Sequence, residues 1–333
     1  MGLALPYHQA CPAVAGSAAA IAGSGPAAGA SGSLARALTL LQGAADQREI
    51  GPWLLRHQAD WLMGWLLGDW RWGEEANNLR LGWDLERQTW SGSIGRQSWA
   101  GSLPTIQPSG RRLGCLSPEA AAELDLPDTC QVVSGSTDAN AGVLAADPAQ
   151  GDGVAVLGTT LVLKRFVVAP LQGPGISCHR VAGRWLVGGA SNSGAGVLRQ
   201  FFSDGQLAEL SRQIDPDRRS GLQLRPLPRR GERFPDDDPE LEPILGPRPC
   251  SDVLFLQGLL EGLSDIEARG WQRLQPVDAP PLRRVISLGG GAVNSQWRLL
   301  RQRRLGLPVL NRPHLSAALG MARLAARRMG NCS

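Results

Sequence analysis

The sequence predicts an α/β fold, and two patterns carry that prediction. Residues 154–157 and 161–168 are apolar runs joined by the short turn 158–160, which is typical of a hairpin of buried strands. Residues 285–288 form another short apolar run, and a triple glycine leads from it into an expected helix at 294–304. Strands that lead into helices through glycine turns are characteristic of α/β domains.

The first elements of the chain are expected to be helices. Residues 1–32 are rich in alanine, glycine and serine, and Ser33 is a suitable N-cap for a short helix carrying leucines. A second helix is expected from Pro52 to Leu67, with Gly68 as its C-cap.

Tryptophan is concentrated in this part of the chain. Eight of the eleven tryptophans lie between Trp53 and Trp99, and Trp53, His57, Trp61 and Trp65 recur at steps of four. Aromatic residues at helical spacing usually pack in a core, so we favour a packed helical face over a ligand cage.

The second half of the chain continues with strands and helices. A strand is expected at 184–187, and a helix within 191–202 after Gly194 and Gly196. Residues 229–249 are rich in proline and acidic residues, which indicates a long surface loop. Helices are expected at 252–274, capped by Ser251 or Asp252, and at 316–329.

Composition favours a globular protein of two domains and excludes several classes. The 333 residues are 43% apolar and 19% charged, enough for one or two sizeable cores. The net charge of +4 rests on scattered arginines, since Lys164 is the only lysine, so we expect no nucleic-acid partner. We also expect no membrane partner and a cytoplasmic location, because neither an export signal nor an apolar run of about twenty residues is present.

Cysteine and histidine spacing predicts neither disulfides nor a metal cage. The six cysteines are widely spaced without a Cys-x-x-Cys pair, so we expect reduced thiols, and the four histidines are far apart along the sequence.

Asp138 is the strongest candidate for chemistry. It lies in Ser134-Gly-Ser-Thr-Asp-Ala-Asn-Ala-Gly142, where small neighbours would let a substrate hydroxyl approach a carboxylate that acts as general base. The alternative is that Asp138 caps a helix beginning near Ala139, because aspartate is a preferred N-cap residue.

Two glycine-containing turns could bind phosphate. Gly158, Thr159 and Thr160 could offer backbone amides and hydroxyls to an anion, although an ordinary hairpin turn explains them equally well. Residues 289–291 could admit a nucleotide close to the backbone at the start of a helix. They form neither a Walker loop nor a complete dinucleotide fingerprint.

Taken together, these segments resemble the FGGY family of carbohydrate kinases. Besides the segments around Asp138, Gly158 and the triple glycine, the resemblance includes Glu75-Ala-Asn-Asn78 in the first half, Ser193-Gly194, Gly231-Glu-Arg-Phe-Pro235 and the closing alanine-rich helix. It implies a ribonuclease H-like (actin-like ATPase) fold of two domains, at 1–147 for the sugar and 148–333 for the nucleotide.

The resemblance also implies roles for individual residues. Asp138 would be the catalytic base, and Thr137 and Gln9 would contact the substrate with it. Mg²⁺ and ATP would be the cofactors, with no metal ligand assigned in this chain. The ATP-binding residues would be Gly158, Thr159, Thr160, Gly194, Gly290, Gly291 and Asn294.

The nearest pattern within the family is that of the xylulokinase and ribulokinase-like enzymes. It implies phosphorylation of a pentulose, D-xylulose or D-ribulose, at a terminal hydroxyl, by an enzyme that could form a homodimer.

One departure from the family pattern concerns the first domain. Family members begin with a strand that ends in an Asp-x-Gly-Thr loop, whereas here no acidic residue precedes Asp46. We therefore expect an incomplete first domain that lacks the phosphate-binding segment. The alternative function is a non-catalytic protein that binds nucleotide or sugar and acts as a regulator or partner. An actin-fold ATPase of the chaperone or cytoskeletal kind is a third alternative.

Overall fold

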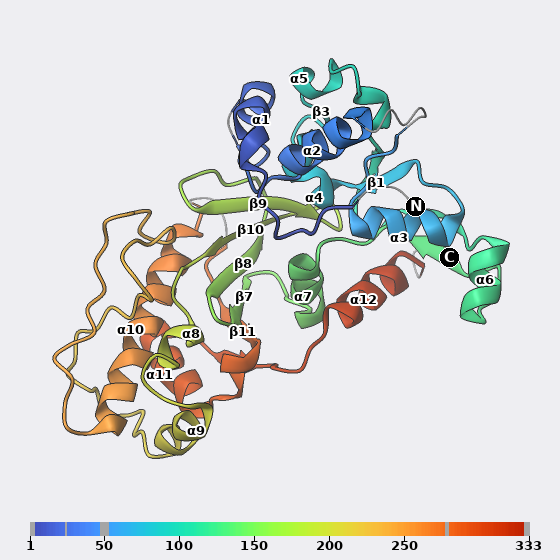
Figure 1. Cartoon of the computed structure of the whole chain (residues 1–333). Helices are drawn as coiled ribbons and strands as arrows, with labels where there is room; N and C mark the ends of the chain where they lie inside the picture. Colours follow the sequence, from blue (N-terminus) through green and yellow to red (C-terminus); the bar gives the residue numbers. More distant parts are fainter. Residues whose placement is uncertain (1–3, 24, 47–52, 277–279, 330–333) are drawn as a thin grey trace. The chain divides into compact units, whose positions relative to one another are not determined.

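The computed structural model describes residues 4–23, 25–46, 53–276 and 280–329 (Figure 1). By its internal contacts the chain divides into two compact units. Unit 1 comprises the described residues of Met1–Asp138, Arg180–Gly183 and Leu324–Ser333. Unit 2 comprises those of Ala139–His179 and Arg184–Arg323. Boundaries between the units fall inside helix α7 (Asp138–Ala146), inside strand β9 (Ile176–Val181) and inside helix α12 (Ala317–Met329).

Unit 1 is built from short elements. Its longest described helix is α2 (Ser33–Asp46), and Ser33, which was expected to be the N-cap, is its first residue. Its described strands form two-stranded sheets, with β1 parallel to β4 and the pairs β2–β3 and β5–β6 antiparallel. The remaining elements are η1 (Pro12–Val14), α1 (Ala15–Ala22), α3 (Gln58–Leu67), β1 (Trp72–Glu74), α4 (Glu75–Asn78), η2 (Leu79–Leu81), β2 (Trp83–Asp84), β3 (Thr89–Trp90), α5 (Gly92–Gly95), η3 (Ala100–Ser102), β4 (Thr105–Gln107), β5 (Arg112–Cys115), α6 (Pro118–Leu124) and β6 (Gln131–Val133).

The tryptophan-rich helix is shorter than expected. Gly68 ends α3 in the left-handed conformation, as expected, but the helix begins at Gln58, and Pro52 lies outside the described residues. The expected helix start is therefore wrong. The Leu55 amide donates to the carbonyl of Ser102, so this segment is held by a distant loop rather than by a helical turn. Trp61 is 43% exposed, so the tryptophans do not form one buried face.

Unit 2 is organised around a mixed sheet with the strand order β12-β11-β7-β8-β10-β9. β11 is parallel to β7 and β12, and β8 is antiparallel to β7 and β10. The hairpin expected at 154–168 is confirmed, whereas β9 was not expected. The strands are β7 (Asp152–Leu157), β8 (Leu161–Val167), β9 (Ile176–Val181), β10 (Arg184–Ala190), β11 (Arg284–Leu288) and β12 (Val309–Asn311).

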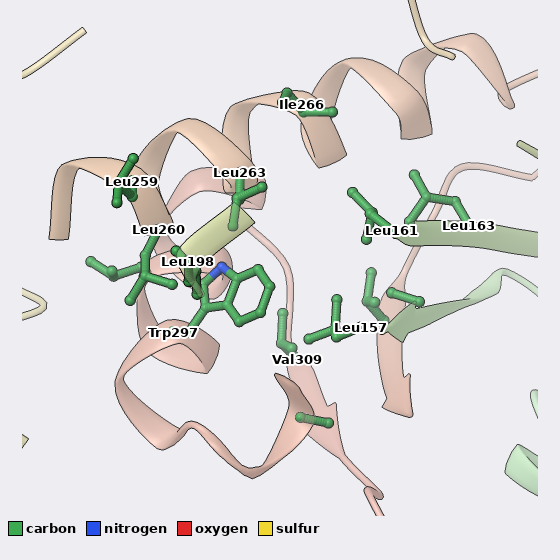
Figure 2. Packing of buried hydrophobic residues seen from close by; sticks show 14 of the residues in the cluster. Leu157, Leu161, Leu163, Leu198, Leu259, Leu260, Leu263, Ile266, Trp297 and Val309 are labelled. Carbon is green, nitrogen blue, oxygen red and sulfur yellow. The ribbon is translucent and has the colours of Figure 1, made fainter. Parts of the chain in front are cut away.

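The core of unit 2 lies between this sheet and two helices. The long α10 (Asp252–Arg273) and α11 (Ser295–Leu305) pack against each other, and the Ser251 side chain caps α10 by accepting from the Leu254 amide. Figure 2 shows the Trp297 side chain of α11 beside Leu260 and Leu263 of α10. Trp297 is 2% exposed, so this indole fills the space between the helices.

Three further α-helices complete the second half of the described chain, and the last of them crosses the boundary between the units after Arg323. The expected helix within 191–202 is only α8 (Ala195–Leu198), and a second helix, α9 (Asp204–Arg212), follows a capping box at Ser203. α12 (Ala317–Met329) approaches α7 so closely that a Cβ on Gly320 would overlap the carbonyl oxygen of Ala141.

The segment 229–249 is not a simple surface loop. Glu232 and Phe234 are 2% and 1% exposed, and Glu232 forms a β-bridge with Asp238. The segment has no helix or strand and is largely exposed, as expected of a surface loop, but a buried carboxylate and a buried phenyl ring anchor it to the core.

The described residues bear on two expectations about the chain, its cysteines and its lack of a membrane-spanning segment. The cysteines there, Cys11, Cys115, Cys130, Cys178 and Cys250, are all free thiols, while Cys332 lies outside the described residues. In the same part of the chain, every helix is too short or too polar to cross a membrane.

Candidate functional site

The sheet of unit 2 brings the glycine-containing turns to one edge. In the strand register Leu157 pairs with Leu161, Val156 with Leu288, and Val162 with Ala190. The turns that follow β7, β10 and β11 therefore leave the sheet at the same end. Crevices at the carboxyl ends of strands are where open α/β sheets bind ligands.

The turn at 158–160 packs directly on the segment that contains Gly194. The amides of Ala195 and Gly196 donate to the carbonyls of Gly158 and Thr159 at 2.9 and 3.2 Å. A Cβ on Gly194 would lie 2.5 Å from the Thr159 carbonyl oxygen, so only glycine fits there. The structure thus brings Gly158, Thr159, Thr160 and Gly194 together, and the Thr159 side chain is exposed at this edge.

A buried carboxylate that the sequence argument did not assign holds this segment in place. Glu232 accepts from the Ser191 hydroxyl at 2.5 Å and from the Asn192 amide at 2.7 Å. Its neighbour Arg233 donates from Nε to the carbonyl of Ala190 at 2.6 Å. The Gly-Glu-Arg motif at 231–233 was the sequence signal for this interaction. In the fold, its side chains hold the end of the strand that leads to Gly194.

The triple-glycine turn forms the third part of this edge. Gly289 has φ +83°, and a Cβ there would lie 3.1 Å from the Leu157 carbonyl oxygen. Gly291 packs under Trp297, where a Cβ would lie 2.7 Å from the ring. Gly290 is exposed, and a Cβ on it would meet no atom within 4 Å. Of the three glycines, Gly290 is therefore the one whose backbone is open to a ligand.

Asn294 has a structural role at the end of the same turn. Its Oδ1 accepts from the Trp297 amide at 2.9 Å and caps α11, while Nδ2 donates to the Ser211 hydroxyl at 2.8 Å. The side chain that the family resemblance assigns to ATP thus also links α11 to α9.

The described residues at this edge leave room and hydrogen-bond donors for a nucleotide, but they do not form a cluster of metal ligands. The open backbone at Gly290 and the exposed Thr159 hydroxyl leave room and donors for a phosphate chain. Within the described ranges, no group of three or more His, Cys, Asp or Glu side chains is placed to hold a metal ion. Mg²⁺ commonly reaches such sites through the phosphates with few protein ligands, so we assign it to no residue here.

Asp138, Thr137 and Gln9 belong to unit 1. Asp138 is the exposed first residue of α7, where the helix dipole favours a negative charge. Thr137 is half-buried directly before it. Gln9 is exposed in the N-terminal segment, and its carbonyl accepts from Arg36 at 3.1 Å.

A cluster of buried acidic side chains lies in unit 1 near the segment that leads to Asp138. Asp60 and Glu74 are each 1% exposed and Glu75 is fully buried. Asp60 accepts from the Glu74 amide at 3.0 Å and from Asn78 Nδ2 at 2.8 Å, and Glu74 Oε1 lies 3.5 Å from the Ser136 hydroxyl. Nothing in the sequence signalled this burial.

Burial governs the charge of this cluster. It raises the pKa of Asp60 from 3.8 to about 6, despite the hydrogen bonds that favour the carboxylate. It raises the pKa of Glu74 well above its ordinary value and also raises that of Glu75. These carboxyls therefore favour their neutral forms more than surface carboxyls do.

A hollow of about 690 Å³ in unit 2 lies away from the glycine turns. It is lined by α10, α11 and the segment around residues 219–225, and none of the site residues expected from the sequence lines it. We therefore do not include it in the candidate site.

Comparison with known proteins supports the fold. No family model matches the sequence. A solved structure titled a xyloylose kinase from Brucella ovis superposes with a TM-score of 0.80 at 21% identity, over 98% of this chain and 70% of that chain. The xylulose kinase from Rhodospirillum rubrum gives 0.78 at 20% identity over the same shares, 98% and 70%. The gluconate kinase from Lactobacillus acidophilus gives 0.74 at 15% identity, over 95% and 67%. The chain therefore has the fold of these kinases, the actin-like ATPase fold that the family resemblance implied.

Proposed function

We propose that this protein is an ATP-dependent carbohydrate kinase that phosphorylates a terminal hydroxyl of a pentulose, D-xylulose or D-ribulose. The observation that carries the proposal is the gathering of the 158–160 turn, Gly194 and Gly290 at one edge of the unit 2 sheet. The likeness to solved structures named as sugar kinases supports the same reaction class.

Each part of the site has a defined task in this reaction. ATP supplies the phosphoryl group that is transferred. The exposed Thr159 and the open backbone at Gly290 hold its phosphates, and Gly194 keeps the two turns in contact. Asp138 accepts the proton of the sugar hydroxyl as its oxygen attacks the γ-phosphorus, and the bond to the β-phosphate oxygen breaks to leave ADP.

The test is sugar-dependent ADP release by the wild-type chain and by Asp138→Asn. The amide cannot accept the proton, so we expect kcat to fall by about 10²–10⁴-fold, the usual contribution of a general base. Asp125→Asn is the matched control, because Asp125 is an exposed carboxylate in the left-handed conformation at the end of α6, which asparagine tolerates.

Three outcomes separate the alternatives. Loss of turnover in Asp138→Asn alone supports the proposal. Equal turnover in Asp138→Asn and the wild type contradicts the role of Asp138. Thermal stabilisation by ADP or a pentulose without any turnover would replace the kinase with a non-catalytic binding protein.

A further inference from the structure

A buried lysine contacts the helix that begins at Asp138. Lys164, the only lysine of the chain, is 6% exposed, and its Nζ donates to Asn140 Oδ1 at 2.7 Å. Asn140 is itself fully buried and is the third residue of α7. The bond therefore links the middle of the sheet to the first turn of that helix.

The surroundings accommodate the lysine stem. Lys164 lies on β8, opposite Val154 of β7 and Gly188 of β10. A Cβ on Gly188 would lie 2.8 Å from Lys164 Cγ, so the missing side chain at 188 leaves room for the stem. The position is thus shaped for a long, unbranched side chain.

Nearby charge is kept low. His179 on β9 is half-buried, and both desolvation and the charge of Lys164 lower its pKa to about 4. The imidazole is therefore neutral near pH 7, and a second positive charge does not form beside the ammonium group.

A methionine could fill the space of the lysine stem. It would do so without the cost of moving an ammonium group out of water. Unlike methionine, the lysine donates a directed hydrogen bond to Asn140 Oδ1 in the first turn of α7.

We propose that Lys164 is a positioning residue for Asp138, acting through Asn140. The ammonium group fixes the Asn140 side chain and with it the first turn of α7, so that the carboxylate two residues earlier is held in one orientation. The inference rests on the proposed function, in which Asp138 is the base.

The test replaces Lys164 with methionine and measures kcat and KM for sugar and ATP. Misplacing a catalytic group by about 1 Å can cost about 10²-fold, so we expect Lys164→Met to lower kcat by about 10–100-fold with both KM values unchanged. Lys164→Met combined with Asn140→Ala should be no slower than the slower single variant, because both changes remove the same bond.

Arg165→Met is the matched control for general damage to the sheet. Arg165 is the next residue of β8 and is 2% exposed, but its guanidinium bonds to Gln275 Oε1 and to the Pro280 carbonyl. We expect a comparable loss of thermal stability in this variant with kcat close to that of the wild type. Equal loss of kcat in both variants, or none in Lys164→Met, would overturn the inference while leaving the kinase proposal standing.

A second measurement does not depend on turnover. Hydrogen exchange of the amides 139–146 should be at least about tenfold faster in Lys164→Met than in Arg165→Met, because only the former loses the bond to α7. If the wild type proves inactive, the kinase proposal fails, and this comparison still decides whether Lys164 orders the helix. Equal exchange in the two variants refutes that ordering.

Discussion

At the scale of single residues, Asn294 shows how one side chain can combine two roles. Its oxygen caps α11, and its amide group bonds to Ser211. Asn294 itself lies at the end of the turn where the family resemblance places ATP. A loss of binding after its removal could therefore arise from structure as well as from contact.

Two substitutions at Asn294 separate these roles. Asn294→Ala removes the cap and should destabilise the fold by about 1 kcal/mol, while Asn294→Asp keeps a capping oxygen and should stay within about 0.5 kcal/mol of the wild type. Both should weaken ADP binding if the amide group contacts the nucleotide. Urea unfolding and ADP titration would check this, and wild-type affinity in Asn294→Asp would remove Asn294 from the binding site.

Asp60 predicts how stability depends on pH. Its pKa is raised in the folded state from 3.8 to about 6, so the folded chain binds this proton more tightly than the unfolded chain. Its contribution to stability is greatest below about pH 4, falls by about 3 kcal/mol as the pH rises to about 6, and is constant above that. Glu74 and Glu75 shift in the same direction.

Asp60→Asn removes this titration and should flatten the decline in stability between pH 4 and 6. Urea unfolding followed by tryptophan fluorescence reports on this region, because eight of the eleven tryptophans lie at 53–99. An unchanged slope in Asp60→Asn would show that other groups cause the decline.

The same acidic residues mark a limit of prediction from sequence. Asp and Glu are almost never fully buried, and the sequence analysis assigned no buried position to Asp60, Glu74 or Glu75. Their burial results from tertiary packing of short elements, which local sequence does not encode. Asp138, by contrast, was singled out by its small neighbours, and its role as a base stays a prediction.

At the scale of elements, α10 and α11 are joined by a buried ion pair. Arg301 Nε lies 2.5 Å from Glu267 Oε2, and the two side chains are 0% and 1% exposed. Arg301 also donates to the Ser287 hydroxyl at 2.7 Å, so the pair connects both helices to β11. Breaking a buried pair leaves an uncompensated charge in the core.

Glu267→Ala should therefore destabilise the chain by about 3–5 kcal/mol. Asp265→Ala is the matched control on the same helix, because its pair with Arg304 is roughly half exposed and should contribute about 0–1 kcal/mol. Chemical denaturation of both variants would check the difference. Equal losses would contradict the assigned burial of the Glu267 pair.

Elements with strong local signals were predicted well. α10 and α11 follow capping residues, and the β7–β8 hairpin follows two apolar runs. β9 was missed because Ile176-Ser-Cys-His-Arg-Val181 mixes polar and apolar residues, and it becomes a strand by pairing with β10. The segment 229–249 is the loop that its proline and acidic content predicted, but that composition gave no sign of the buried anchors Glu232 and Phe234.

At the scale of the whole molecule, the α/β fold was predictable because motif order constrains topology. The turns at 158–160, Gly194 and 289–291 each follow a strand, and the register of the unit 2 sheet brings them to one edge. The sequence could not show that Glu232 holds one of these turns, or that Lys164 bonds to the helix of Asp138, since both contacts join segments far apart in the chain.

Transfer of labelled γ-phosphate from ATP to a pentulose tests the central claim most directly. The account predicts a labelled sugar phosphate, carrying the label at a terminal hydroxyl, for D-xylulose or D-ribulose with the wild-type chain, and a rate about 10²–10⁴-fold lower with Asp138→Asn. Absence of labelled sugar with the wild type, or equal labelling by the two proteins, would contradict it.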